Sequence, residues 1–464
     1  MRERWRSRLG LILSSSGAAI GLGLLWQFPF IMGKQGGGSF FLLYAFFTLF
    51  IGIPLFLAEL LLGRIGQSGV VRIFSRLKSL EELHHPSCST SCSSTEKLQT
   101  TSPWSWVGHG SLWIALGTLS YYCVIAGWGM SYSLSSLLQV GKGGTTLGHL
   151  AGTFDSLSTS LTLNLVWSSL FLLLTFIVVS RGIASGVEKW SSILMPLLVA
   201  LLLLLCVVAV FMPGFKEGLS FAFSLGPVRR ESVMFALGLS LFTMSVGQGQ
   251  ILTYGSYTSS SIFIARTAGI VGLMMLIMAA LFCFMFYPFL FSFHLPANGG
   301  EGLVFSMMPL IFSQMVGGTF LCVLFFFLFT FTGFTTAIAF MEVVVADLMD
   351  RCSWDRRKAS LIALALVWLL SLPVSVSHSG FLFPHWHLLF QRSYFDTIVF
   401  LVSNWGIPLV ALGVSLTAGW GLSEKVCLRE WKEGEGLFRL WRFLVRWVIP
   451  GAILCILIHS WVHA

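Results

Sequence analysis

Two glycine-rich interruptions of apolar segments are the first places in this chain where chemistry could occur. In the first, Gly17, Gly21 and Gly23 lie within an apolar run that is long enough to cross a membrane and that reaches Pro29. Glycine weakens a helix by roughly 1 kcal/mol relative to alanine. A helix that breaks inside a bilayer exposes backbone amides and carbonyls, which persist only where protein encloses them or where they line a polar cavity. The sequence therefore predicts a binding site at this break.

A second interruption of the same kind, SVGQGQ, runs from Ser245 to Gln250 in the sixth apolar segment. A unit of five helices that begins on one side of a membrane ends on the other, so a repeat of that unit runs inverted, with a site between its broken helices. The amino ends of half-helices attract a carboxylate, and free carbonyls attract a cation or an ammonium group. Paired breaks therefore suit an amino-acid zwitterion. The alternative is that the glycines only allow close helix packing, but two breaks five helices apart favour a site.

The elements that must position these breaks are apolar segments of about 20 residues or more. The chain has 464 residues, of which 56% are hydrophobic and 10% charged, and its mean hydropathy is +0.85. These values predict an all-α, multi-pass integral membrane protein with eleven transmembrane helices. The predicted segments are 9–33, 39–63, 104–139, 159–180, 187–212, 232–256, 262–293, 317–349, 359–376, 394–421 and 438–462.

The charge distribution predicts the orientation in the membrane. The net charge of +9 comes from short basic clusters between apolar runs, which argues against a nucleic-acid partner. With the amino terminus inside, 22 of the 28 Lys and Arg fall on the inner side, as the positive-inside rule requires. We therefore expect a protein of the cell (inner) membrane, embedded in the lipid bilayer, with a cytoplasmic amino terminus and an external carboxy terminus. Several of the nine cysteines lie in apolar segments, so no disulfide framework is implied.

The predicted organisation follows from these segments. It comprises a cytoplasmic amino terminus (1–8), a first five-helix repeat (9–212) that contains a cytoplasmic loop (67–103), an outer loop (213–231), a second, inverted five-helix repeat (232–421), a cytoplasmic connection (422–437) and an eleventh helix (438–464). The stretch 79–103 is rich in Ser and Thr and reads as a solvated loop. Its His84, His85, Cys88 and Cys92 have spacings that could bind zinc, although no predicted secondary structure frames them. The segments 294–313 and 377–392 are too short or broken to span and are expected to cap an outer vestibule.

Several longer motifs carry a family resemblance. They are RxxWxxRLGLIL from Arg2, GxAxGLG from Gly17, GIPLFLAELLLGR from Gly52, LFTMSVGxGxxxTYGSY from Leu241 and FTGFTTAIAFMEVVVADLMD from Phe331. In their order and residues they resemble the neurotransmitter:sodium symporters, particularly the bacterial eleven-helix amino-acid transporters, over nearly the whole chain except 79–103. The resemblance implies sodium-coupled import of an amino acid or related small zwitterion by alternating access, with no organic cofactor and no enzymatic activity. We expect a monomer or weak dimer.

The resemblance also implies which residues form each site. The sodium site would use Gly17, Ile20, Thr332, Thr335 and Thr336. The three threonines are spaced i, i+3 and i+4 and so share a helix face, and an all-oxygen set suits a hard cation. A threonine in an apolar helix often bonds back to its own turn instead. The substrate would contact Ala19, Leu22, Gly23, Thr118, Tyr122, Phe242, Thr243, Ser245, Gln248 and Phe340. Gln248 would make the side-chain pocket more polar, unless it caps free backbone groups.

The gates and the ion count are where the chain departs from the family pattern. The cytoplasmic gate is complete, as Arg2, Ser256, Tyr257 and Asp350. A second sodium site of the family lacks its side-chain oxygens, because Leu24 and either Met274 or Met275 stand there, so we expect one sodium ion only. The outer gate is remodelled, because Gln27 and Val399 stand where the family has an arginine and an aspartate. Asp396, one turn before Val399, could form a weaker closure with Gln27.

Two alternatives to sodium symport remain open at this stage. Glu342 lies in the apolar eighth segment, where an ionisable group is costly and often functional, so it could carry a proton in a proton-coupled transporter. It could equally be a carboxylate satisfied by hydrogen bonds. The second alternative is a membrane sensor that keeps the fold and does not transport.

Overall fold

The computed structural model describes residues 2–77, 102–140, 152, 154–295, 303–377 and 385–462, and these residues form helices with short connections. Nine helical spans in the described residues are long and apolar enough to cross a membrane. They are Gly38–Gly66 (α3, η2, α4), Ser105–Leu138 (α7), Leu161–Val179 (α10), Ile183–Val210 (η3, α11), Ile264–Ser292 (α15), Gly318–Cys352 (α17), Arg356–Ser375 (α18), Leu388–Gly421 (α20, η6, α21, η7) and Glu435–Val462 (α23, η8, α24), where η marks a π-helical turn.

Two of the spans predicted from sequence, 9–33 and 232–256, are interrupted in the structure, and the first of them would count as a tenth span among the described residues. The first is α1 (Arg8–Ala19) followed by η1 (Gly23–Gln27) and α2 (Phe28–Lys34), with a bend of 53° between the two parts. The second is α13 (Arg230–Thr243) followed by α14 (Gln250–Ser256). Both interruptions lie where the glycine patterns predict them, and the described chain has the predicted order of an all-helical, multi-pass membrane protein with a broken first helix.

Short helices fill the connections. They are α5 (Val70–Ser75), α9 (Phe154–Thr159), α12 (Phe215–Phe223), η4 (Leu303–Met307), α16 (Met308–Ser313), α19 (Trp386–Phe390) and α22 (Glu424–Glu430). The eleventh helix begins at Glu435, three residues earlier than predicted. The possible zinc ligands His84, His85, Cys88 and Cys92 lie outside the described residues.

Sequence signals explain several helix starts. Ser7 caps α1, because its hydroxyl oxygen accepts a hydrogen bond from Gly10 N at 2.9 Å. Ser393 caps α20 in the same way through Asp396 N at 3.0 Å. These contacts satisfy amides that a helix cannot bond internally.

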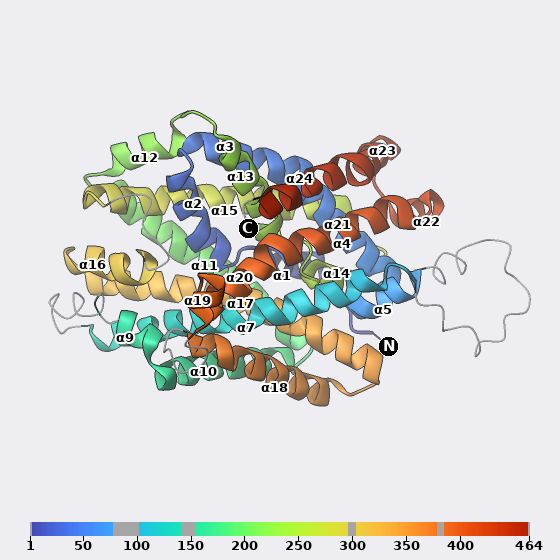
Figure 1. The fold of residues 1–464 in the computed structure, drawn as a ribbon, viewed down its shortest axis with the longest axis horizontal. Helices are drawn as coiled ribbons and strands as arrows, with labels where there is room; N and C mark the ends of the chain where they lie inside the picture. The colour runs from blue at the N-terminus through green and yellow to red at the C-terminus, as the bar shows by residue number, and fades with distance from the viewer. Residues whose placement is uncertain are drawn as a thin grey trace, which may run out of the picture.

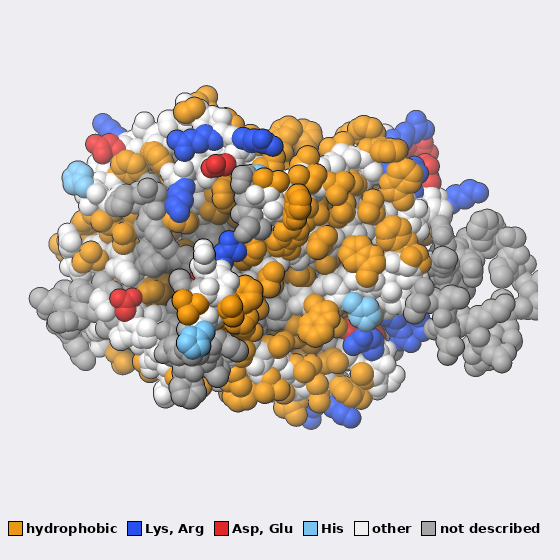
Figure 2. Space-filling view, in the orientation of Figure 1, with side chains coloured by type: hydrophobic (Ala, Val, Ile, Leu, Met, Phe, Trp, Pro, Cys, Tyr) orange, Lys and Arg blue, Asp and Glu red, His pale blue; other side chains and the backbone are white. Residues whose placement is uncertain are grey.

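The centre of the molecule is formed by α1, α7 and α17, with α10 and α18 on one side and α3, α12 and α13 on the other (Figure 1). The first described residues lie at the same end as α5, α14 and α22 (Figure 1); we refer to this end as the amino-terminal end. Figure 2 shows hydrophobic side chains over much of the middle of the visible face, with many Lys and Arg toward its two ends. Many large apolar residues are exposed, including Leu273, Leu369 and Ile458. A lipid bilayer would cover such a surface.

Candidate substrate and sodium site

The break in the first span is held open by contacts with other helices. Regular bonding ends when Gly21 N donates to Ala19 O at 2.9 Å, and Leu22 N then donates to the Tyr122 hydroxyl of α7 at 2.9 Å. A Cβ on Gly21 would lie 2.9 Å from that hydroxyl, and a Cβ on Gly23 would lie 2.3 Å from the Phe242 ring. The glycines therefore serve both uses weighed from sequence, since they break the helix and also admit close neighbours.

The break in the second span depends on left-handed backbone. Ser245, Gly247 and Gly249 have φ values of 54°, 78° and 79°, a region that costs little only for glycine. The freed amide of Gly247 donates to Glu59 Oε1 at 2.6 Å, and Glu59 is fully buried in α4. From sequence we assigned Glu59 no part in the site; the only available signal was a carboxylate within an apolar helix.

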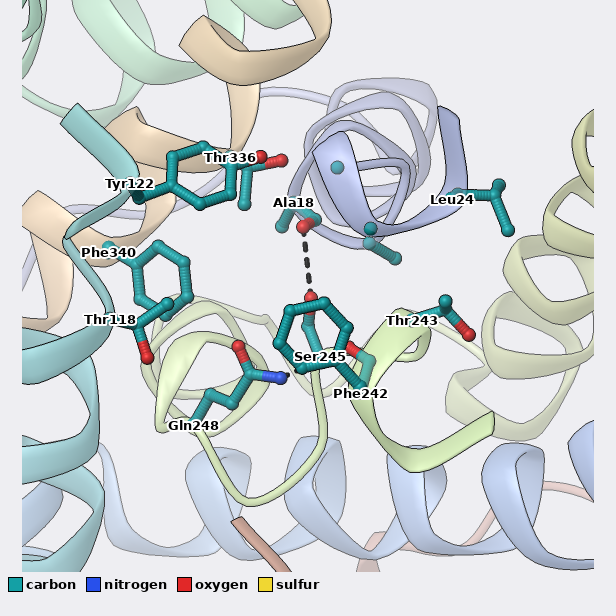
Figure 3. A pocket seen from close by; sticks show the side chains of 13 residues that line it. Ala18, Leu24, Thr118, Tyr122, Phe242, Thr243, Ser245, Gln248, Thr336 and Phe340 are labelled. Carbon is teal, nitrogen blue, oxygen red and sulfur yellow. Dashed lines mark hydrogen bonds between the residues drawn. The ribbon is translucent and has the colours of Figure 1, made fainter. Parts of the chain in front are cut away.

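The two breaks meet in space. The Ser245 hydroxyl donates to Ala18 O at 2.9 Å, which joins the second break to the end of α1 (Figure 3). Gln248 Nε2 donates to Phe242 O at 3.1 Å, so its amide does cap a free carbonyl, while its oxygen points away from that bond, toward Phe340 and Thr118 (Figure 3). The Thr118 hydroxyl is buried and has no partner in the described part of the chain.

A cavity lies between the breaks, α7 and α17. Nine of the ten predicted substrate residues line it, and the tenth, Leu22, instead donates its amide to Tyr122. Ala18, Gly21, Leu24 and Thr336 also line it, of which Ala18 and Gly21 had been assigned no role from sequence. Its volume is about 20 Å³, which is room for about one water molecule. This structure is therefore a closed form, and a larger ligand requires side chains such as Phe242 to move.

Four of the five predicted sodium residues come together beside this cavity. Thr336 Oγ1 donates to Gly17 O at 3.1 Å and to Thr332 O at 3.3 Å. Thr335 Oγ1 donates to Thr332 O at 3.1 Å, and a Cβ on Gly17 would lie 3.2 Å from Thr335 Cβ. The fifth, Ile20, directly follows the end of α1 and is fully buried. Each of the three threonine hydroxyls donates to a carbonyl in the preceding turn of α17, as threonines in apolar helices often do. The Thr336 hydroxyl also bonds α1, through Gly17 O.

The position of the family's second sodium site is apolar. Leu24 and Met275 are fully buried, and the Ser16 hydroxyl donates to Met274 Sδ at 3.4 Å. Thioether and methyl groups are poor ligands for a hard cation.

The four predicted residues of the cytoplasmic gate lie together at the amino-terminal end. Arg2 forms an ion pair with Asp350, and its Nη2 donates to the Ser256 hydroxyl at 2.7 Å. The guanidinium also lies 4.7 Å from the centre of the Tyr257 ring. Next to it, Trp5 Nε1 donates to Tyr254 O at 3.0 Å. The segment before α1 is therefore bonded to the carboxy-terminal end of α14, which follows the second break.

Glu342 extends this gate. Its carboxylate accepts from the Tyr257 hydroxyl at 2.6 Å and from both terminal nitrogens of Arg356, at 2.8 and 3.0 Å. Arg356 also lies 3.1 Å from a carboxylate oxygen of Glu3. Glu342 is thus the hydrogen-bonded carboxylate of the two possibilities weighed from sequence. Sequence reasoning missed Arg356 and Glu3, because partners on different helices leave no spacing signal.

Asp396, one of the two residues expected to form the outer gate, forms a local hydrogen bond instead. Asp396 accepts from the Ser393 hydroxyl at 2.6 Å, in the first turn of α20. Among the described residues, no hydrogen bond joins Gln27 to Asp396, so the expected closure between them is not formed in this structure.

Comparison with known proteins places this arrangement in a family. The model of the sodium:neurotransmitter symporter family matches residues 2–82 and 150–463. The chain belongs to this family. It is therefore a transporter-family member, a multi-pass membrane protein, and not an enzyme.

This chain aligns with its relatives over almost the full length of both chains. It is 30% identical to the sodium-dependent transporter YhdH of Bacillus subtilis, over 98% of this chain and 97% of that one. It is 28% identical to a sodium-dependent transporter of Haemophilus influenzae, over 99% and 98% of the two chains. Among solved structures, the crystal structure of MhsT in complex with L-phenylalanine matches with a TM-score of 0.85 and 31% identity, over 99% of this chain and all of MhsT.

Proposed function

We propose that this symporter imports an amino acid or a related small zwitterion together with one sodium ion, by alternating access. The observation that carries the proposal is the meeting of both helix breaks with the α17 hydroxyls at one enclosed cavity. The relatives described as sodium-dependent transporters, and the phenylalanine bound in MhsT, agree with this ligand class.

The substrate roles follow from the free backbone groups. The amides of Leu22 and Gly23 and the Tyr122 hydroxyl would bind the carboxylate, because they lie at the amino end of a half-helix. The end of α1 at Ala19 and the end of α13 at Phe242 and Thr243 would offer carbonyls to the ammonium group, with the Ser245 hydroxyl beside them. The substrate side chain would then extend toward Thr118, Gln248 and Phe340.

The sodium ion would lie between the threonine hydroxyls of α17 and the carbonyls that they now bond. The Thr336 hydroxyl points its hydrogen at the Gly17 and Thr332 carbonyls. If it turned, its oxygen and those carbonyls would face a common cation, with Thr335 and Ile20 completing an all-oxygen set that suits Na⁺. Because α1 contributes Gly17 and α17 contributes the threonines, the ion would join two helices that must separate when the inner side opens. Its binding would therefore favour the closed inner side.

The cytoplasmic gate would close the exit. The pairs Arg2–Asp350 and Glu3–Arg356 tie the segment before α1 to α17 and α18, and Arg356–Glu342 joins these two helices to each other. We place this end in the cytoplasm and the carboxy terminus outside the cell, on the charge distribution. The proton-coupled alternative is weakened, because both oxygens of Glu342 are engaged by Arg356 and Tyr257.

Uptake into proteoliposomes tests the proposal. A panel of amino acids is offered with a sodium gradient, a pH gradient or both, at a set membrane potential; 100 mV contributes about 2.3 kcal/mol per charge. Sodium-driven accumulation of at least one amino acid is expected. Accumulation that follows the pH gradient alone would instead support proton coupling. Substrate binding without any uptake would support the sensor.

A further inference from the structure

A second cavity, distinct from the transport site, opens at the amino-terminal end. It has a volume of about 240 Å³ and lies between the segment before α1 and the connection from α14 to α15. Its walls carry two arginines, hydroxyls and two aromatic rings, from Arg6, Arg8, Ser259, Ser261, Trp5 and Phe263.

Both arginines of this cavity lack a counter-ion. Among the described residues, neither the Arg6 nor the Arg8 guanidinium takes part in an ion pair or a hydrogen bond, and Arg8 Nε is buried without a partner. A buried donor without an acceptor is costly, more so on a charged group. Arg6 is exposed, so the buried donor that the protein leaves unsatisfied in this cavity is Arg8 Nε.

Two carboxylates bond backbone amides beside this cavity. Glu188 accepts from Arg6 N at 2.8 Å and from Ser7 N at 3.2 Å. Glu433 accepts from Ala265 N at 2.8 Å. Glu188 and Glu433 therefore hold the backbone next to the cavity in place. Within the residues that the structure describes, neither forms an ion pair with Arg6 or Arg8.

The other walls indicate what an anion here would look like. The hydroxyls of Ser259 and Ser261 bond each other at 2.7 Å, so at least one hydrogen can turn toward a ligand. On the helices that lead away from the cavity, Leu9, next to Arg8, is 63% exposed, and Ile270, seven residues along the chain from Phe263, is 39% exposed. An oxyanion site bordered by exposed apolar side chains suits a phosphate group that carries hydrocarbon chains.

We propose that this cavity binds a phosphate group, supplied by the headgroup of an anionic phospholipid of the leaflet at the amino-terminal end. Guanidinium groups bind phosphate oxygens through charge-assisted hydrogen bonds. Basic pockets between helices on the cytoplasmic side are suited to lipid headgroups. This cavity shares no lining residue with the transport cavity, and lipid binding to it can be measured whether or not the protein transports.

Occupation of the cavity would also affect the cytoplasmic gate. Trp5 forms one wall of the cavity, and its indole nitrogen donates to Tyr254 O. Trp5 lies only three residues after Arg2, the gate residue that pairs with Asp350. A ligand that binds only when these walls are together stabilises that state over one in which they separate. The bound headgroup would thus hold the gate in its closed form.

Lipid binding to the purified, full-length protein tests the proposal without any transport measurement. Native mass spectrometry, with thermal unfolding in parallel, compares mixed micelles that contain phosphatidylglycerol or phosphatidylcholine. The wild type is expected to retain phosphatidylglycerol in preference and to unfold at a higher temperature with it. Arg6→Gln/Arg8→Gln should weaken that binding by more than about tenfold, because two charge-assisted contacts are lost.

The controls separate this site from general surface charge. Arg181→Gln/Lys189→Gln removes two exposed basic residues elsewhere and should bind the lipid as the wild type does. Equal unfolding temperatures without lipid show that both double variants are folded. Inorganic phosphate forms the soluble arm: an equal, arginine-dependent shift with phosphate alone would show a soluble ligand and overturn the lipid source. Absence of any preference, or preference that survives Arg6→Gln/Arg8→Gln, would overturn the site itself.

Discussion

The proposed sodium site makes a sharp prediction for Thr336→Val, which keeps the shape of the side chain and removes its hydroxyl. The lost group now bonds Gly17 O at 3.1 Å across the break, and it would supply one of five oxygens to the ion. A contact with a charged group contributes about 1.5–3 kcal/mol, and 1.4 kcal/mol corresponds to about a tenfold change in affinity. Sodium should therefore bind about ten- to a hundredfold more weakly.

Thr332→Val is the matched control on the same helix. The Thr332 hydroxyl donates only within its own turn, to Leu328 O at 2.7 Å, and its proposed role uses the carbonyl, which the substitution leaves in place. This variant should keep its sodium affinity within about threefold.

The assay is a sodium titration of substrate binding, with thermal unfolding at each sodium concentration to follow the ion directly. In the absence of sodium, Thr336→Val should lose only about 1 kcal/mol of stability, the net value of one neutral hydrogen bond. Wild-type sodium affinity in Thr336→Val, or equal losses in both variants, would refute the assignment of the Thr336 oxygen as a ligand.

Three further predictions concern the gate, the second break and the ion count. Glu342→Gln removes one of the two carboxylates that face the Arg356 guanidinium, the other being that of Glu3, and should lower the free energy of unfolding by about 1.5–3 kcal/mol. In Glu342→Gln/Arg356→Gln the loss should be smaller than the sum of the single losses, and additive values in a thermal double-mutant cycle would contradict the pairing. Gly249→Ala forces a side chain into backbone with φ 79° and should cost about 1–2 kcal/mol and weaken substrate binding. Gly238→Ala, whose Cβ would meet nothing within 4 Å, should be neutral or stabilising in the same unfolding assay, so equal effects would count against strain at the break. The sodium dependence of uptake should have a Hill coefficient of about 1, and a value clearly above that would require a second coupled sodium ion.

The helices and their breaks could be predicted well from the sequence because both depend on local properties. A run of apolar residues long enough for a bilayer has few alternatives to a helix. The break at the second site could be placed because Gly247 and Gly249 adopt backbone that other residues avoid. Threonines 332, 335 and 336 share a helix face whatever that face meets.

Partners from distant parts of the chain could not be predicted in the same way. Glu342 shows the limit: its place in an apolar helix was evident, but whether it carried a proton or formed a pair depended on Arg356, which the next helix supplies. Asp396 shows the reverse, because its bond is local, to Ser393, whereas sequence alone suggested the distant Gln27.

By itself, the sequence determined a helical membrane protein of this family, the positions of its two breaks, and the shared helix face of Thr332, Thr335 and Thr336. Only the tertiary structure decided that the breaks face each other, through Ser245 and Ala18. It also decided that Glu59 satisfies the freed amide of Gly247, and that Arg6 and Arg8 line a cavity without a counter-ion. The physical reason is that helix formation and helix breaking follow from neighbours along the chain, whereas the pairing of a buried charge or a freed amide depends on which helix packs beside it.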